Sequence, residues 1–297
     1  MKLRQIGMLG YGEVGKTFAA GLLTAVDGVS AWDLKFDKSQ TRDAERADAA
    51  LAGIRVAASM PDACGNADLL ISAVTASNTL DVARGAAAVL RPGTVYLDLN
   101  SASPGTKREA AALIEAAGGR YVEAGVMTSV PPYGIRVPML LGGPHAAALA
   151  ERLVTWGMDA RVVSDQLGVA SAIKMCRSVM IKGLEALVIE SYATARAYGV
   201  EEHVIPTLQE TFPSIDWQQT GGYFFGRVVQ HGQRRAEEMR EAAHSVAEAG
   251  FEPFMARAIA DKQQWVADQA RDGLFRDVAK DAPWQDYADR LIAARKT

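Results

Sequence analysis

A glycine-rich turn near the start of the chain constrains the fold more than any other feature. Glycines stand at positions 10, 12 and 15, after the apolar run 3–9 and before a segment with helical periodicity. Strand, glycine turn and helix in this order make the dinucleotide-binding fingerprint: the first glycine permits a tight turn, the second admits a pyrophosphate, and the third lets helix and strand pack closely. The predicted cofactor contacts are Gly10, Tyr11, Gly12, Glu13, Val14 and Gly15.

An acidic residue lies where this fingerprint needs one. Asp33 ends the next apolar stretch, 29–32, about 20 residues after the turn, where a carboxylate accepts hydrogen bonds from the adenosine ribose. A carboxylate there disfavours a 2′-phosphate and favours NAD over NADP, although the nearby Lys35 keeps NADP open. The alternative is that the glycines only form a tight turn and Asp33 is a solvated loop residue.

Composition excludes several classes of protein. The 297 residues allow one large or two ordinary domains, and 49% of them are hydrophobic, which is ample for a core. The net charge of −3 gives no sign of a nucleic acid or anionic membrane partner. We expect neither a signal peptide nor a segment apolar for long enough to span a bilayer. Cys64 and Cys176 have neither metal-site nor disulfide-framework spacing, so we expect a cytoplasmic protein without a metal.

Strands and helices alternate through the first half of the chain. Strand patterns occur at 54–57, 68–74, 94–98, 120–126, 137–141 and 160–163, and helical patterns at 38–51, at 79–90 and from 145. This alternation indicates βαβ units and a parallel sheet. The expected fold class is α/β, with a doubly wound, Rossmann-type, dinucleotide-binding domain at residues 1–165.

Polar residues follow two of the predicted strands. Ligands bind such sheets beyond the carboxyl ends of the strands, so Val74, Thr75, Asn100 and Ser101 should form one wall of a cleft with the glycine turn. Ser103 is better explained as the N-cap of the next helix. Asn100 and Ser101 have no such structural explanation and are candidate ligands, while Val74, Thr75 and Asn100 are predicted to contact the cofactor.

The second half of the chain is predicted to be all helical. Residues 169–198 read as a single helix about 45 Å long, at 1.5 Å per residue, which would join the sheet domain to a second domain within 166–297. Further helices are expected at 200–210, 214–220, 223–248, 253–270 and 284–294.

Polar residues form a stripe along the long helix. Lys174, Ser178 and Glu185 share this stripe, and Lys182 lies at its edge. If Lys174 points into a cleft between the domains, partial burial would lower its pKa and make it a usable acid or base. The alternative is that this lysine extends along apolar surface to reach water.

A second polar group lies in the segment 231–239. His231, Arg234, Arg235 and Glu238 occupy one helical face. The arginines could bind a substrate carboxylate, because a guanidinium pairs with it through two hydrogen bonds. We favour instead a solvated, ion-paired face or a contact between subunits.

Together these residues resemble the β-hydroxyacid dehydrogenase superfamily, which includes 6-phosphogluconate and 3-hydroxyisobutyrate dehydrogenases. The resemblance covers nearly the whole chain and rests on the glycine turn, on residues 98–104, and on Gly168 followed six residues later by Lys174. The likeness is closest to a less characterised branch, through residues 98–101, 174–178, 182–187 and 231–239.

The resemblance implies particular roles. Lys174 would be the general acid/base, and the loop of Asn100 and Ser101 would orient the substrate. The helical domain would form a homodimer in which one subunit can complete the other's site. Three substrate-facing positions depart from the superfamily pattern: Asn100 replaces a serine, residues 127–129 replace a serine–glycine–glycine run, and Ser178 replaces an asparagine. The substrate therefore cannot be assigned by analogy.

The function expected is that of an NAD- or NADP-dependent oxidoreductase. It would transfer a hydride between nicotinamide and the hydroxyl or carbonyl carbon of a small hydroxy acid, with Lys174 as general acid/base. One alternative is an imine or other carbonyl-type reductase on the same scaffold, which would not need this lysine in that role. Another is a dinucleotide-binding protein without turnover. The candidate substrate contacts are Asn100, Ser101, Met127, Thr128, Ser178, His231 and Arg234.

Overall fold

The computed structural model describes residues 2–36 and 42–294. The chain divides into two compact units, Met1–Met175 and Cys176–Thr297. The first unit ends ten residues (175 − 165) beyond the boundary expected from sequence, inside the long helix α7 (Val169–Tyr198). Within the described residues, no helix combines the length and the hydropathy needed to cross a bilayer.

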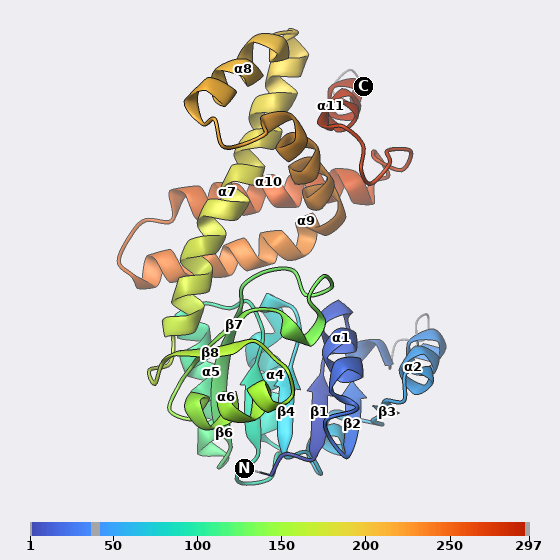
Figure 1. The fold of residues 1–297 in the computed structure, drawn as a ribbon, viewed down its shortest axis with the longest axis vertical. Coiled ribbons are helices and arrows are strands. Elements are labelled where there is room, and N and C mark those ends of the chain that lie inside the picture. The colour runs from blue at the N-terminus through green and yellow to red at the C-terminus, as the bar shows by residue number, and fades with distance from the viewer. Residues whose placement is uncertain (1, 37–41, 295–297) are drawn as a thin grey trace. The chain divides into compact units, whose positions relative to one another are not determined.

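The first unit is built on an eight-stranded sheet with the order β3-β2-β1-β4-β5-β6-β7-β8 (Figure 1). Neighbouring strands are parallel except β6 and β7, which are antiparallel. No α-helix lies in the loop 127–138 that joins these two, whereas parallel neighbours are usually joined by a crossover helix. The strands are β1 (Gln5–Leu9), β2 (Gly28–Trp32), β3 (Arg55–Val56), β4 (Leu69–Ser72), β5 (Val95–Asp98), β6 (Arg120–Val126), β7 (Met139–Gly142) and β8 (Ala160–Ser164).

Helices cover both faces of this sheet, which confirms the doubly wound Rossmann architecture. The short helix α3 was not predicted, and the part of the expected helix at 38–51 that precedes residue 42 lies outside the described residues. The helices are α1 (Glu13–Leu22), α2 (Arg42–Leu51), α3 (Met60–Cys64), α4 (Thr79–Ala87), α5 (Pro104–Ala116) and α6 (Ala146–Thr155), with single 3-10 turns η1 (Leu34–Phe36), η2 (Ala76–Asn78) and η3 (Gly134–Arg136).

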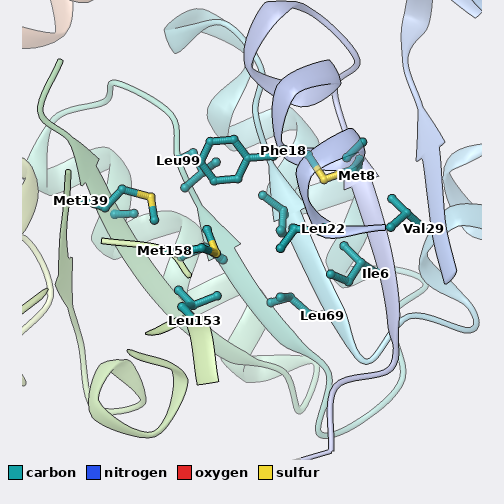
Figure 2. Packing of buried hydrophobic residues seen from close by; sticks show 14 of the residues in the cluster. Ile6, Met8, Phe18, Leu22, Val29, Leu69, Leu99, Met139, Leu153 and Met158 are labelled. Carbon is teal, nitrogen blue, oxygen red and sulfur yellow. The ribbon is translucent and has the colours of Figure 1, made fainter. Parts of the chain in front are cut away.

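Apolar side chains alternate between the two faces, as the two-residue period of a strand requires. On β4, Leu69 and Ile71 join the cluster that packs against α1 and α6, while Leu70 joins the cluster under α3, α4 and α5. Figure 2 shows Phe18 and Leu22 of α1 among the side chains of the first cluster. A core on each face leaves the ends of the strands as the place for a ligand.

The described residues of the second unit form helices and connecting loops with no strand, as expected. The break expected between residues 220 and 223 is wrong, because one helix runs through both glycines there. A Cβ on Gly221 would lie 2.7 Å from Tyr192 and 3.0 Å from Trp284, so this glycine serves close packing rather than a turn. The helices are the later part of α7, then α8 (Glu201–Thr211), α9 (Trp217–Glu248), α10 (Phe254–Arg271) and α11 (Trp284–Ala294).

Candidate functional site

The three glycines of the turn have the geometry that a dinucleotide needs. Gly10 has φ +97°, and a Cβ there would lie 2.4 Å from the carbonyl oxygen of Ala73. A Cβ on Gly15 would lie 2.1 Å from the carbonyl oxygen of Gly10. Helix α1 can therefore pack this close to the turn after β1 only because position 15 is glycine. Gly12 is the N-cap of α1 and has no neighbour within 4 Å of an added Cβ. The open helix N-terminus fits a pyrophosphate.

The side chain of Tyr11 turns away from this opening into the core. The ring is 1% exposed and lies 5.7 Å from the ring of Phe36, centroid to centroid. Burial raises the pKa of the Tyr11 hydroxyl, and the neighbouring Asp48 raises it further. Tyr11 therefore has its backbone, and not its side chain, at the turn, and Glu13 and Val14 lie in the first turn of α1.

Asp33 is tied to the glycine turn. Its Oδ2 accepts a hydrogen bond from the backbone N–H of Tyr11 at 2.6 Å, and its Oδ1 accepts one from Lys35 at 2.8 Å. The side chain lies directly after β2 and is half-buried. Each carboxylate oxygen can accept a further hydrogen bond, so these contacts leave Asp33 able to accept from a ribose hydroxyl.

Asn100 joins the loops that follow β4 and β5. Its Oδ1 accepts a hydrogen bond from the backbone N–H of Val74 at 2.7 Å, and its Nδ2 donates to the hydroxyl of Ser72 at 2.9 Å. Asn100 is 3% exposed, whereas Ser101 is half-buried and Thr75 is exposed. The amide thus holds the loops together at the carboxyl edge and keeps one further hydrogen bond available at each of its polar atoms.

A fully buried ion pair lies beneath this loop, and sequence reasoning missed it. The Lys107 ammonium lies 2.8 Å from Asp98 Oδ1, and the hydroxyl of Tyr121 donates to Asp98 Oδ2 at 2.7 Å. Asp98 Oδ1 also accepts the backbone N–H of Asn100 at 2.9 Å, so the pair fixes the start of the loop. Burial raises the pKa of the Tyr121 hydroxyl, and Asp98 adds to the shift. The available signal was a lysine on the apolar face of the helix at 104–116.

Lys174 stands at the same edge of the sheet. It is half-buried on α7 and belongs to the first unit. A Cβ on Gly125, near the carboxyl end of β6, would lie 3.5 Å from the Cβ of Lys174 and 3.0 Å from the carbonyl oxygen of Ala170. Met127 and Thr128 follow β6 directly. Because β1, β4, β5 and β6 run parallel as neighbours, Lys174, the Asn100 loop and the glycine turn lie at one edge.

The remaining predicted site residues belong to the second unit. Ser178 is buried on α7, where its hydroxyl accepts a hydrogen bond from the Lys182 ammonium at 3.2 Å. Lys182 lies 2.9 Å from Glu238, which also pairs with the exposed Arg234 at 2.8 Å. His231 is half-buried one helical turn before Arg234.

Residues 231–239 were expected to form a solvated, ion-paired face or a subunit contact; the ion pairs are present, but the solvation is wrong for two members. Arg235 and Glu238 are only 4% and 7% exposed. Arg235 pairs with the buried Glu185, and Gln263 contributes an amide to the same carboxylate at 3.4 Å. An arginine and a glutamate sit on this inner face because each meets an opposite charge on α7, which the helical period alone does not reveal.

Two family models match the chain. The model described as the NAD binding domain of 6-phosphogluconate dehydrogenase matches residues 5–148. A model described as a domain of unknown function, DUF1932, matches residues 195–266. The first match covers the glycine turn, Asp33 and the Asn100 loop, which are the residues whose geometry fits a dinucleotide.

Similar proteins carry the assignment over the whole chain. A conserved hypothetical protein from Sinorhizobium meliloti 1021 is 36% identical, with a TM-score of 0.75 over 98% of this chain and 97% of that one. A conserved protein of unknown function, described as structurally similar to 3-hydroxyacid dehydrogenases, is 30% identical, with a TM-score of 0.66 over 90% of this chain and 99% of that one.

A named dehydrogenase is more distant. A probable 3-hydroxyisobutyrate dehydrogenase of Mycobacterium tuberculosis is 26% identical over 201 residues, which are 66% of this chain and 65% of that protein. The glycine geometry, the matched NAD binding domain and these relatives indicate the same family. The chain belongs to the β-hydroxyacid dehydrogenase superfamily.

Proposed function

We propose that the protein is an NAD(P)-dependent oxidoreductase that interconverts a small hydroxy acid and its carbonyl form. The observation that carries this proposal is the position of Lys174, an amine on the carboxyl edge of the sheet that also bears the glycine turn and the Asn100 loop. Lys174, the glycine turn and the Asn100 loop all belong to the first unit.

Each candidate residue would have a distinct role in the reaction. A bound nicotinamide supplies hydride acceptance or donation. Lys174 takes the proton from the substrate hydroxyl during oxidation and returns one to the carbonyl oxygen during reduction. Asn100 and Ser101 hold the polar groups of the substrate, and their rigid loop limits the geometries that the reacting carbon can adopt. Met127 and Thr128 line the same side.

We further propose that NAD is the preferred cofactor. Asp33 supports this, because its carboxylate is already oriented by two backbone N–H groups and would repel a 2′-phosphate. A hydroxy acid also carries a carboxylate, for which Ser178, His231 and Arg234 remain the candidate contacts. Arg234 supplies an exposed guanidinium whose partner Glu238 is buried beside Lys182.

The proposed assembly is a homodimer formed through the helical unit. Large apolar side chains exposed on α7 support it: Met180 is 65% exposed and Leu187, seven residues later on the same stripe, is 55% exposed. The proposed compartment is the cytoplasm. Both cysteines are free thiols, and burial raises the pKa of Cys64 to about 12, which keeps that thiol protonated.

A substrate screen tests the function. Hydroxy acids and sugar acids are offered with NAD⁺ and with NADP⁺, and nicotinamide reduction is followed by absorbance. The matched control is Gly12→Ala, which fills the open space at the N-terminus of α1 without meeting any neighbour. We expect turnover of at least one acid by the wild type and none by the control.

Two outcomes would overturn the proposal. Cofactor binding without turnover of any acid would leave a dinucleotide-binding protein. Reduction of a carbonyl compound only when an amine is present would identify an imine reductase on this scaffold. The second outcome is tested with NADH and NADPH, a carbonyl compound and an amine, by following nicotinamide oxidation at the same wavelength.

A further inference from the structure

A buried glutamate on β6 holds the start of the helix that carries Lys174. The carboxylate of Glu123 is fully buried and accepts three hydrogen bonds, all from the first turn of α7 or the residue before it. Its Oε1 accepts the backbone N–H groups of Gly168 at 2.8 Å and Ala170 at 3.1 Å, and its Oε2 accepts the hydroxyl of Ser171 at 2.5 Å. A side chain 45 to 48 positions earlier in the sequence thus caps the helix.

The charge of Glu123 suits this place. The first N–H groups of an α-helix have no partner within the helix, and they form the positive end of its dipole. A buried carboxylate would be costly without donors, but here three donors converge on it. Burial, charge and geometry together favour one position of the helix start relative to β6.

The neighbouring glycines fit the same arrangement. A Cβ on Gly142 of β7 would lie 2.5 Å from Glu123 Oε1, so the adjacent strand leaves room for the carboxylate. Gly125, two residues after Glu123 and on the same face of β6, lets the backbone of α7 pass close to the strand at Ala170 and Lys174. One strand therefore both caps the helix and receives its second turn.

We infer that Glu123 is a positioning residue for Lys174, fixing where the amine stands at the carboxyl edge of the sheet. Lys174 lies six positions after Gly168, so a helix start held by three hydrogen bonds defines both the height and the rotation of that side chain. The effect on turnover rests on the proposed function. The effect on the placement of the amine does not.

Three substitutions at Glu123 separate positioning from charge. Glu123→Gln keeps an oxygen that accepts both backbone N–H groups, and its amide can donate to Ser171. Glu123→Asp keeps the charge but withdraws it by one methylene group, which breaks the contacts unless the helix moves. Glu123→Ala removes the cap. The matched control is Asp68→Asn, because Asp68 also accepts two backbone N–H groups, from Arg4 and Gln5, at the opposite edge of the sheet.

The first measurement needs no substrate. The full-length variants are acetylated with limiting acetic anhydride, and the labelling rate of Lys174 is divided by that of the exposed Lys2 in the same sample. We expect the ratio to rise several-fold in Glu123→Ala and Glu123→Asp, because fraying of the first turns exposes the amine. It should stay at the wild-type value in Glu123→Gln and Asp68→Asn.

The second measurement uses turnover. With any substrate from the screen, kcat should fall about 10- to 100-fold in Glu123→Asp and Glu123→Ala, since a misplacement of about 1 Å can cost about 100-fold in rate. The cofactor Kd should change little, because the glycine turn is untouched. Glu123→Gln should retain most of the wild-type activity.

The outcomes are decisive with or without activity. An unchanged labelling ratio in the Asp and Ala variants would overturn the inference, and should Glu123→Ala fail to fold, Glu123→Asp decides alone. An equal rise in Asp68→Asn would overturn it too, because the effect would then reflect general loosening. Absence of wild-type turnover would contradict the proposed function. The labelling ratio would then still test whether Glu123 positions Lys174.

Discussion

The carboxylate of Asp33 accepts the backbone N–H of Tyr11 at 2.6 Å, so the end of β2 is bonded to the glycine turn that follows β1. The same carboxylate is the proposed partner of the adenosine ribose. The Asp33 side chain therefore supports the turn and would determine the preference for NAD over NADP. Measuring the Kd of both cofactors separates these two roles.

Asp33→Asn should weaken the preference for NAD. The amide removes the charge that repels a 2′-phosphate and gives up one acceptor. A hydrogen bond to a charged group contributes about 1.5–3 kcal/mol, so NAD affinity should fall about 10-fold or more. NADP affinity should fall less or rise. Titration of both cofactors measures this, with Asp27→Asn at the other end of β2 as control, and an unchanged ratio of the two Kd values would contradict the assignment.

The glycines of the turn should separate binding from folding. Gly12→Ala adds a methyl group in open space, so unfolding free energy should stay within about 0.5 kcal/mol while dinucleotide binding is lost. Gly15→Ala forces a methyl group onto the carbonyl of Gly10 and should destabilise the unit by about 1–3 kcal/mol. Urea unfolding and cofactor titration test both. Tight cofactor binding by Gly12→Ala would show that the phosphate lies elsewhere.

The buried pair under the Asn100 loop should be costly to break. Lys107→Met leaves the carboxylate of Asp98 buried with neutral donors only, and the expected loss is about 3–5 kcal/mol of unfolding free energy. Adding Asp98→Asn removes the uncompensated charge and should recover part of that loss. If the double variant were less stable than the single one by the full cost of a second independent substitution, the two residues would not be coupled.

Stability should fall in acid through a cluster on the second unit. Arg196 pairs with Asp289 through two hydrogen bonds, at 2.9 and 3.0 Å, and with Glu201 at 2.5 Å. These bonds lower the pKa of Glu201 from its ordinary 4.5 and that of Asp289 from 3.8. Groups with lowered folded-state pKa values stabilise the fold above their ordinary values, and that contribution is lost as pH falls through the folded ones.

Thermal unfolding between about pH 6 and pH 3 measures the effect. The wild type should lose more of its Tm over this interval than Arg196→Met, in which the carboxyl pKa values return toward normal. Because Arg196 and Asp289 are partly exposed, the difference should shrink in high salt. Identical pH profiles for the two proteins would contradict the role of this cluster.

Local patterns predicted most of the architecture. Helix α7 begins and ends at the residues expected, because glycine precedes it and its apolar period is long and uninterrupted. The break expected at 220–223 failed for a different reason. Gly221 looks like a helix terminator in the sequence, yet it is needed where α9 passes Tyr192 and Trp284. Tertiary packing decides such a glycine, and no local signal reports it.

The candidate site was predictable from sequence where all the residues involved belong to one local motif. The glycine turn and Asp33 belong to one βαβ unit, so their spacing is enough. Glu123 and Lys107 were missed because their partners are distant in sequence, 45 residues away for Gly168 and nine for Asp98. Arg235 and Glu238 were placed on the surface for the same reason. A charge on an apolar face is the only warning that a buried partner exists.

The amine of Lys174 is proposed to move the proton in a nicotinamide-dependent reaction. The most direct measurement compares wild type with Lys174→Ala, using a substrate from the screen for kcat and a titration for the cofactor Kd. We predict loss of turnover by several orders of magnitude with the Kd unchanged, and a partial return when small primary amines are added. Substantial residual turnover by Lys174→Ala without added amine would contradict it.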